Sequence, residues 1–144
     1  MSIEFQKAIE KKKILRFTKA KALVKKELKA AKDDLSEAKD RFVNKRYKYA
    51  TITAYYSMFH SARTLLYAKG YREKSHYWLI VAMQSLYVEK GLMDESIVSE
   101  FHDAMVLRED ADYHGEFSKE GAEITLESAE NFLKKARSIV ANNK

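Results

Sequence analysis

The segment that decides the fold is SKEGAEITLESAENFLKKARSIV, residues 118–140, because it carries the most regular apolar pattern in the chain. Its apolar and small residues recur at steps of three and four, at Ala122, Leu126, Ala129, Leu133, Ala136 and Val140. This spacing places them on one face of an α-helix. Ser118 is a typical N-cap, and the lysines at 134 and 135 suit the negative C-terminal pole. The segment therefore predicts an amphipathic helix.

The same periodicity predicts four more helices upstream. They cover about residues 3–44, 47–69, 76–90 and 94–114, and Thr18 is an alternative N-cap that would divide the first of them. The chain has no proline and only four glycines, as expected for an almost wholly helical protein. We expect an all-α fold, an up-and-down bundle of about five helices with a long basic N-terminal helix. The 144 residues are expected to form a single domain.

Charge is concentrated at the N-terminus. Residues 1–32 contain eleven lysines or arginines and three glutamates, a net charge of +8, whereas residues 33–144 carry a net −2. We treat residues 1–20 as a basic N-terminal extension of the domain. Such an arm attracts polyanions such as nucleic acid, although a solvated lysine-rich helix has the same composition. Both interpretations stay open.

Composition also suggests where the protein works. Cysteine is absent, which excludes disulfides and thiolate metal sites. The longest apolar run, residues 77–83, is too short to cross a bilayer, and the N-terminus lacks the layout of a signal peptide. We expect a soluble, cytoplasmic protein with no membrane association.

Polar residues gather in one stretch, VLREDADYHG, residues 106–115. Arg108 shares a helical stripe with apolar residues, so it lies at the margin of the buried face and needs a partner. Asp112 is about 40° away around the helix and is the nearest candidate. The alternative is that Arg108 waits for a phosphate, which its guanidinium can hold with two hydrogen bonds.

His114 diverges from Arg108 by about 120° on a straight helix, so the two cannot converge within it. Unwinding at Gly115 could relieve this. A two-fold axis could instead bring the Arg108 and His114 of two subunits into one cleft, which would make activity depend on a homodimer. An imidazolium is favoured at a helix C-terminus, which suits a general acid.

A second line of residues follows the helix predicted at 47–69, at Tyr56, His60, Arg63 and Tyr67. Aromatic and basic side chains at helical spacing can stack on RNA bases and bind phosphates. The same pattern is also typical of a semi-exposed flank or a dimer face, the interpretation that we favour. His76, in the first turn of the next helix, is a further candidate for contacting RNA or a partner.

Three segments together resemble the HEPN superfamily of helical proteins. They are YATITAYYSMFHSAR at 49–63, Lys74-Ser75-His76 at a helix start, and Arg108 to His114, which matches the family's arginine and histidine pattern. The resemblance covers about residues 20–140. It implies metal-independent RNA cleavage at a dimer cleft, with Arg108 and His114 as the catalytic pair and no cofactor. We expect Asp112, Tyr113 and Glu109 to support that site.

The resemblance also implies a toxin-antitoxin setting, in which the chain is the toxin-like partner of a minimal nucleotidyltransferase. The leading hypothesis is therefore a homodimeric endoribonuclease. The rival is a non-catalytic helical module that binds the nucleotidyltransferase or nucleotides, with Arg108 locked to Asp112. A third possibility is an RNA-binding protein that uses the N-terminal lysines.

Overall fold

The computed structural model describes residues 2–142. Six α-helices alternate with two short strands, one 3₁₀ turn and one π-helical turn in that part of the chain. In chain order these are α1 (Ile3–Glu10), β1 (Ile14–Arg16), the 3₁₀ turn η1 (Ala20–Leu23), α2 (Val24–Val43), α3 (Tyr47–Ala68), β2 (Tyr71–Glu73), α4 (His76–Met83), the π-helical turn η2 (Gln84–Val88), α5 (Glu95–Tyr113) and α6 (Lys119–Asn142). The predicted all-α class is confirmed.

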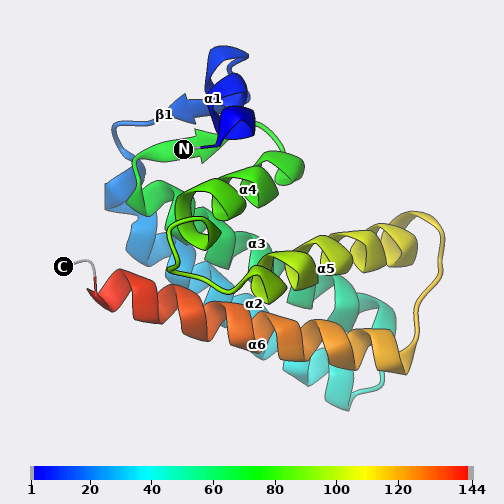
Figure 1. Cartoon of the computed structure of the whole chain (residues 1–144). Coiled ribbons are helices and arrows are strands. Elements are labelled where there is room, and N and C mark those ends of the chain that lie inside the picture. Colours follow the sequence, from blue (N-terminus) through cyan, green and yellow to red (C-terminus); the bar gives the residue numbers. More distant parts are fainter. Residues whose placement is uncertain (1, 143–144) are drawn as a thin grey trace.

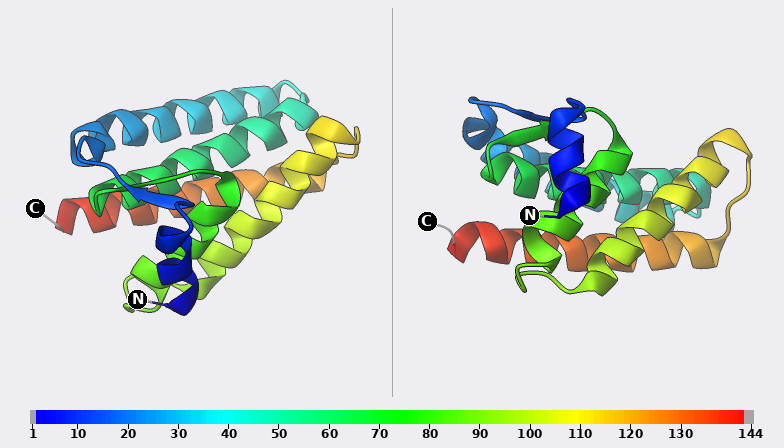
Figure 2. Two further views of the ribbon diagram at one scale, coloured as in Figure 1. Left: turned by 90° about the horizontal axis from the view of Figure 1, so that it is seen from above. Right: turned by 45° about the horizontal axis from the view of Figure 1, so that its top comes forward.

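Helix α3 is the centre of the bundle. It packs against α2, α4, α5 and α6, and Figures 1 and 2 show α2 and α6 running alongside it while α5 crosses at an angle. Small residues let α2 approach closely, since the Ser57 hydroxyl donates to the Ala31 carbonyl at 2.8 Å in the buried interface. Tyr55, Phe59, Ala62 and Leu66 recur along α3 at steps of four and three, and all four are buried.

Predicted helix ends agree with the structure from residue 44 onward, except that the helix predicted at 76–90 is α-helical only to Met83 and continues as the π-helical turn η2 to Val88. Gly70 and Gly115 adopt positive φ angles of 85° and 64°, the left-handed conformation that commonly terminates a helix. Asp94 caps α5 by accepting from the Ser96 amide at 3.1 Å. Ser118 accepts from the Gly121 amide at 2.9 Å near the start of α6.

The continuous N-terminal helix predicted over 3–44 is wrong. Helix α1 ends because Lys12 adopts a φ of 58°, and the amides of Lys12 and Lys13 donate back to Ile9 and Ala8 at 3.0 and 2.8 Å. This is the Schellman arrangement, formed here without glycine. The chain then runs through β1 and η1, so the long helix is α2, which begins at Val24 rather than at the alternative cap Thr18.

Strand β1 brings the N-terminal segment back onto the bundle. It pairs antiparallel with β2, with Ile14 opposite Glu73 and Arg16 opposite Tyr71. Figure 1 shows α1 and this strand pair stacked on the α4 side of the molecule. Phe5 of α1 is fully buried and meets the Tyr71 ring edge-on at 5.5 Å. The lysines of the segment are exposed.

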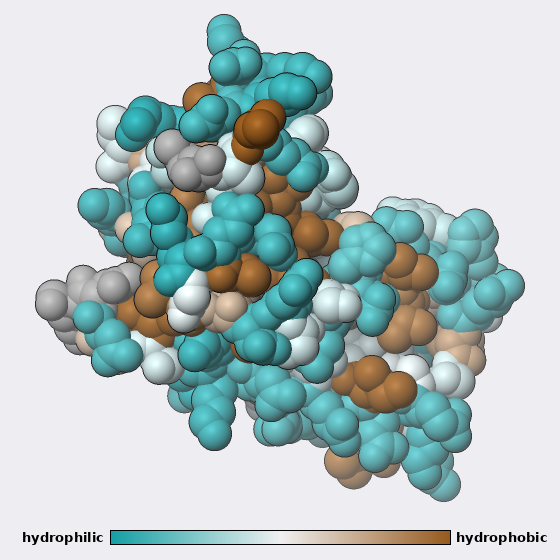
Figure 3. All heavy atoms as spheres, viewed as in Figure 1, coloured by the Kyte–Doolittle hydropathy of each residue, from teal (hydrophilic) through white to brown (hydrophobic). Residues whose placement is uncertain are grey.

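The face of the molecule seen in Figure 3 is largely hydrophilic. Figure 3 shows polar side chains over most of one face, with apolar atoms gathered along α6 and between α5 and α6. None of the helices in residues 2–142 is both long and apolar enough to span a membrane.

The packing of α1 gives a first test. Replacing Phe5 with alanine should lower the free energy of unfolding by about 3–5 kcal/mol, because it opens a cavity under the strand pair. Ile3→Ala is the matched control: Ile3 is 72% exposed on the same helix, and its loss should change stability by less than about 0.5 kcal/mol. Urea unfolding measures both. Equal effects would mean that α1 does not contribute to the cooperative core.

Candidate functional site

Arg108 lies in the C-terminal half of α5 with its side chain turned toward α3. The side chain is only 13% exposed. Its guanidinium carbon lies 5.4 Å from the ring centres of Tyr56 and Tyr113 and 5.9 Å from that of Tyr55. Aromatic faces attract a cation at this distance, so three tyrosines replace part of the lost hydration. The prediction that Arg108 reaches the buried face is consistent with this position.

The polar contacts of Arg108 leave part of the guanidinium unused. Nη2 donates to the Tyr56 hydroxyl at 2.9 Å and lies 3.5 Å from Oδ2 of Asp112. Nε is buried and has no hydrogen-bond partner among residues 2–142. Burial favours the neutral form, but Tyr56, Tyr113 and Asp112 raise the pKa of Arg108 above its ordinary value. The group therefore stays a cation with donors to spare.

His76 lies against Tyr55 and Tyr56, the rings that also contact the Arg108 guanidinium. Its Nδ1 lies 2.7 Å from the Tyr55 hydroxyl, and its ring stacks on Tyr55 and tilts against Phe59 at a centroid distance of 4.4 Å. Burial, together with the positive charges of Arg108 and Arg63, lowers the pKa of His76. His76 is therefore neutral at neutral pH. We call Arg108, Tyr55, Tyr56, His76 and Tyr113 the arginine–aromatic cluster.

His114 lies apart from the cluster within one subunit. It is the C-cap residue of α5, is exposed, and uses its backbone amide to bind the Asp110 carbonyl at 3.1 Å. No side-chain hydrogen bond or ion pair joins it to Arg108 in the described part of the chain. Glu109 is exposed on α5, and its negative charge opposes the lowering of the His76 pKa. The catalytic pairing of Arg108 and His114 stays a prediction.

The line of residues along α3 divides between two sites. Tyr56 accepts a hydrogen bond from Arg108, whereas His60 and Arg63 contact acidic groups from α2 and β2. The contacts are His60 to Glu27 at 2.6 Å, His60 to Asp34 at 3.6 Å and Arg63 to Glu73 at 3.1 Å, and the Arg63 guanidinium lies 5.3 Å from the Tyr67 ring centre. We call Glu27, Asp34, His60, Arg63 and Glu73 the acid–base network. These contacts engage the side chains within the protein, as expected of a packed helix flank.

Burial affects the pKa values of two acids in this network. The Glu73 side chain is 5% exposed, and its Oε1 is buried without a partner in the described residues. Burial raises the pKa of Glu73 even though Arg63 opposes the change. Burial also raises the pKa of Asp34. Sequence reasoning missed both acids and Tyr55, because nothing in the local pattern shows which residues of α2, α4 and β2 meet α3.

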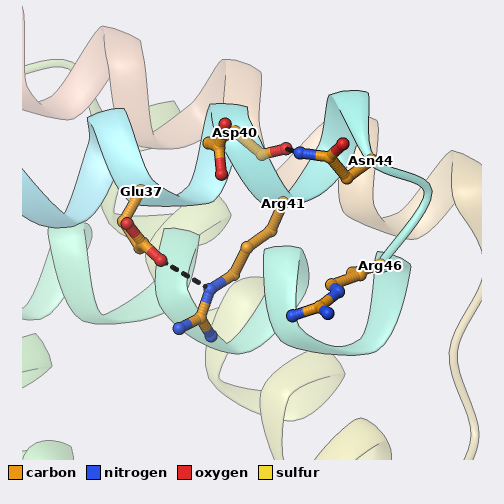
Figure 4. Close-up of a pocket in the computed structure, with 5 residues that line it drawn as sticks. All are labelled: Glu37, Asp40, Arg41, Asn44 and Arg46. Carbon is orange, nitrogen blue, oxygen red and sulfur yellow. Dashed lines mark hydrogen bonds and ion pairs between the residues drawn. The ribbon is translucent and has the colours of Figure 1, made fainter.

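A separate pocket lies where α2 ends and α3 begins. Its volume is about 470 Å³, and Figure 4 shows the residues that line it: Glu37, Asp40, Arg41, Asn44 and Arg46. Arg41 is already paired, with Nε 3.0 Å from Glu37 and Nη1 donating to Thr53 at 3.2 Å. The pocket lies outside the arginine–aromatic cluster and shares no lining residue with it.

Comparison with known proteins matches the HEPN domain to residues 24–141. The chain is 35% identical over 119 residues to a "UPF0332 protein" of Archaeoglobus fulgidus, covering 81% of this chain and 94% of that one. Two proteins of Methanocaldococcus jannaschii, each named "Putative toxin", are 35% and 26% identical over 107 and 112 residues. These alignments cover 74% and 76% of this chain, and 80% and 76% of the relatives. The whole arginine–aromatic cluster lies within the matched residues.

The buried carboxyl of Glu73 predicts a pH effect on stability. A pKa raised above 4.5 in the folded state means that folding favours the protonated acid. Its contribution to the free energy of unfolding is therefore present at low pH and is lost as pH rises from about 4.5 through the raised pKa. The wild-type stability minus that of Glu73→Gln should fall across this window and then level off.

Chemical denaturation at a series of pH values measures this difference. Glu127→Gln, at an exposed glutamate of α6, is the control and should show no such decline. A difference that grows with pH would mean that the Arg63 charge outweighs burial at Glu73.

Proposed function

The chain belongs to the HEPN domain family, and from that premise we propose that it is a toxin-like, homodimeric endoribonuclease that needs no metal. The observation that supports this most directly is the state of Arg108. It is a nearly buried cation that donates to Tyr56 and whose Nε has no hydrogen-bond partner in residues 2–142. Such a guanidinium is suited to the charge that develops on a phosphate during cleavage. The names of two relatives support the toxin assignment.

The proposed reaction uses the nucleophile that RNA itself carries. A neutral histidine takes the proton of a ribose 2′-hydroxyl, the 2′-oxygen attacks the adjacent phosphorus, and the bond to the 5′-oxygen breaks. The imidazolium of a second histidine protonates the leaving 5′-oxygen. The products are a 2′,3′-cyclic phosphate and a 5′-hydroxyl. Arg108 stabilises the added negative charge on the phosphate in the transition state.

A dimer is part of the proposal because no hydrogen bond or ion pair joins His114 to Arg108 within the described part of one chain. Large apolar side chains are exposed near this end of the molecule: Val106, Tyr113, Phe117 and Ile124. Phe117 and Leu107 also line a pocket of about 280 Å³ between the α5 end and the start of α6. Apolar surface of this kind, rimmed by charge, is typical of protein interfaces. We place the two-fold axis here, so that the α5 ends of two subunits meet.

The proposal also includes a partner and a location. A minimal nucleotidyltransferase would act as the antitoxin, and both proteins would work in the cytoplasm, where their RNA target is found. The genomic neighbour tests this pairing, since an adjacent nucleotidyltransferase gene is expected.

A second candidate function has its own supporting observation. Arg108 already lies 3.5 Å from Asp112, as expected of a non-catalytic module whose arginine is internally paired. Such a module would bind the nucleotidyltransferase or a nucleotide without cleaving RNA. The contact is longer than a charge-assisted hydrogen bond and Asp112 is 38% exposed, so the geometry favours the ribonuclease.

Cleavage is tested with purified protein and single-stranded RNA in EDTA. We expect cleavage that leaves 2′,3′-cyclic phosphate ends and that falls at least about 10²-fold in an Arg108→Ala, His114→Ala double variant. His102→Ala, at an exposed histidine of the same helix, is the control and should keep full activity. No cleavage by the wild type, or equal cleavage by the double variant, would contradict the proposed ribonuclease activity and favour the binding module.

The dimer is tested by placing a charge on the exposed apolar surface. Phe117→Asp should shift the protein from dimer to monomer in analytical ultracentrifugation and reduce cleavage in parallel, because a buried carboxylate at an interface is costly. Ile3→Asp alters an apolar residue on α1 that is even more exposed, 72% against 54% for Phe117, and should leave the dimer intact. A monomer that cleaves RNA as fast as the wild type would contradict a site shared between subunits.

A further inference from the structure

Arg108 and His76 lie against the same two tyrosine rings. The Arg108 guanidinium carbon is 5.4 Å from the Tyr56 ring centre and 5.9 Å from that of Tyr55. The His76 ring centre is 6.2 Å and 5.6 Å from these two centres. Residues from α3, α4 and α5 thus converge, although only Arg108 belongs to the arginine and histidine pattern of the sequence. His76 has no role in the cleavage reaction proposed above.

The hydrogen bond from Tyr55 determines which nitrogen of His76 carries the proton. Tyr55 is fully buried, and burial raises its pKa, so its hydroxyl keeps its hydrogen. The only acceptor for that hydrogen among the described residues is Nδ1 of His76, at 2.7 Å. A buried hydroxyl without an acceptor is costly, so Tyr55 donates and Nδ1 accepts. The neutral imidazole therefore carries its proton on Nε2.

The Nε2 group of His76 is an uncommitted donor. Nε2 has no hydrogen-bond partner in residues 2–142. It is not fully buried, so solvent reaches it. Since the pKa of His76 is lowered by burial and by two arginines, the ring holds this neutral N–H form at neutral pH. Nε of Arg108 is likewise without a partner. The cluster thus offers a cation and a neutral donor.

We infer that Arg108 and His76 together form an oxyanion-binding site for a phosphate group, with His76 acting as a fixed hydrogen-bond donor through Nε2. A phosphate oxygen replaces the weak contact of Arg108 with Asp112, and a second oxygen accepts from His76. This deepens the proposed function, because it assigns the phosphate of the RNA backbone to the two residues. His76 is then no general base, since its basic nitrogen is engaged by Tyr55.

Nuclear magnetic resonance of histidine labelled with nitrogen-15 tests the inference. Long-range proton–nitrogen spectra should show Nε2 protonated and Nδ1 as an acceptor at pH 7. Inorganic phosphate should shift the His76 resonances in a saturable way while the exposed His102 stays unchanged. Arg108→Ala should abolish the shift. A proton on Nδ1, or no response of His76 to phosphate, would overturn the inference.

Further titrations identify the source of the phosphate. A 2′-O-methylated single-stranded RNA should perturb His76 at lower concentration than a mononucleotide if the site serves the RNA backbone. A stronger response to the mononucleotide would overturn that assignment and would make the site a nucleotide site.

Kinetics separate this inference from the proposed function. His76→Ala should lower kcat/KM for RNA by about 10²-fold without moving the pKa values of the pH–rate profile, because a hydrogen-bond donor is lost and no general acid or base is removed. Loss of one limb of the profile would make His76 a general base and overturn the inference. If the wild type cleaves no RNA, the proposed function fails, whereas the phosphate shift of His76 still decides the inference.

Discussion

The hydrogen bond from Arg108 to the Tyr56 hydroxyl, at 2.9 Å, is the contact on which the candidate site depends. It gives a nearly buried cation a fixed direction, and the rings of Tyr55 and Tyr113 cover the same guanidinium. Because Tyr55 also engages His76, the packing of α5 on α3 is tied to the start of α4. Helices α3, α4 and α5 must therefore pack together before Arg108 can make these contacts.

Two polar centres of different character lie next to each other along one flank of helix α3, and Phe59 contacts residues of both. In the arginine–aromatic cluster Nε of Arg108 has no partner among the described residues, whereas the acid–base network pairs His60 and Arg63 with Glu27 and Glu73. Residues 94–130 contain twelve acidic and two basic residues, a net charge of −10, and residues 1–32 carry +8. Under the proposed function, RNA would be repelled along α5 and α6, and the basic N-terminal segment would attract it.

Local pattern predicted much of the fold and part of the site. Periodicity was sufficient for the helices after residue 44 and for Arg108 at the buried margin, because both depend on residues within a few turns. It failed at Lys12, a lysine in the left-handed conformation, and at β1, whose partner β2 is more than fifty residues away. The bond between Tyr55 and His76 was also beyond reach, since it joins two helices whose packing no local pattern specifies.

The most direct test of the account asks whether RNA binds at Arg108. Protein labelled with nitrogen-15 at arginine is titrated with a 2′-O-methylated single-stranded RNA in EDTA, and the side-chain Nε–H resonances are followed, with Arg108→Lys used to assign its signal. The account predicts that the Arg108 resonance shifts most among the arginines and saturates with the RNA. An unmoved Arg108 resonance, with changes confined to Arg16 in the basic N-terminal segment, would contradict it.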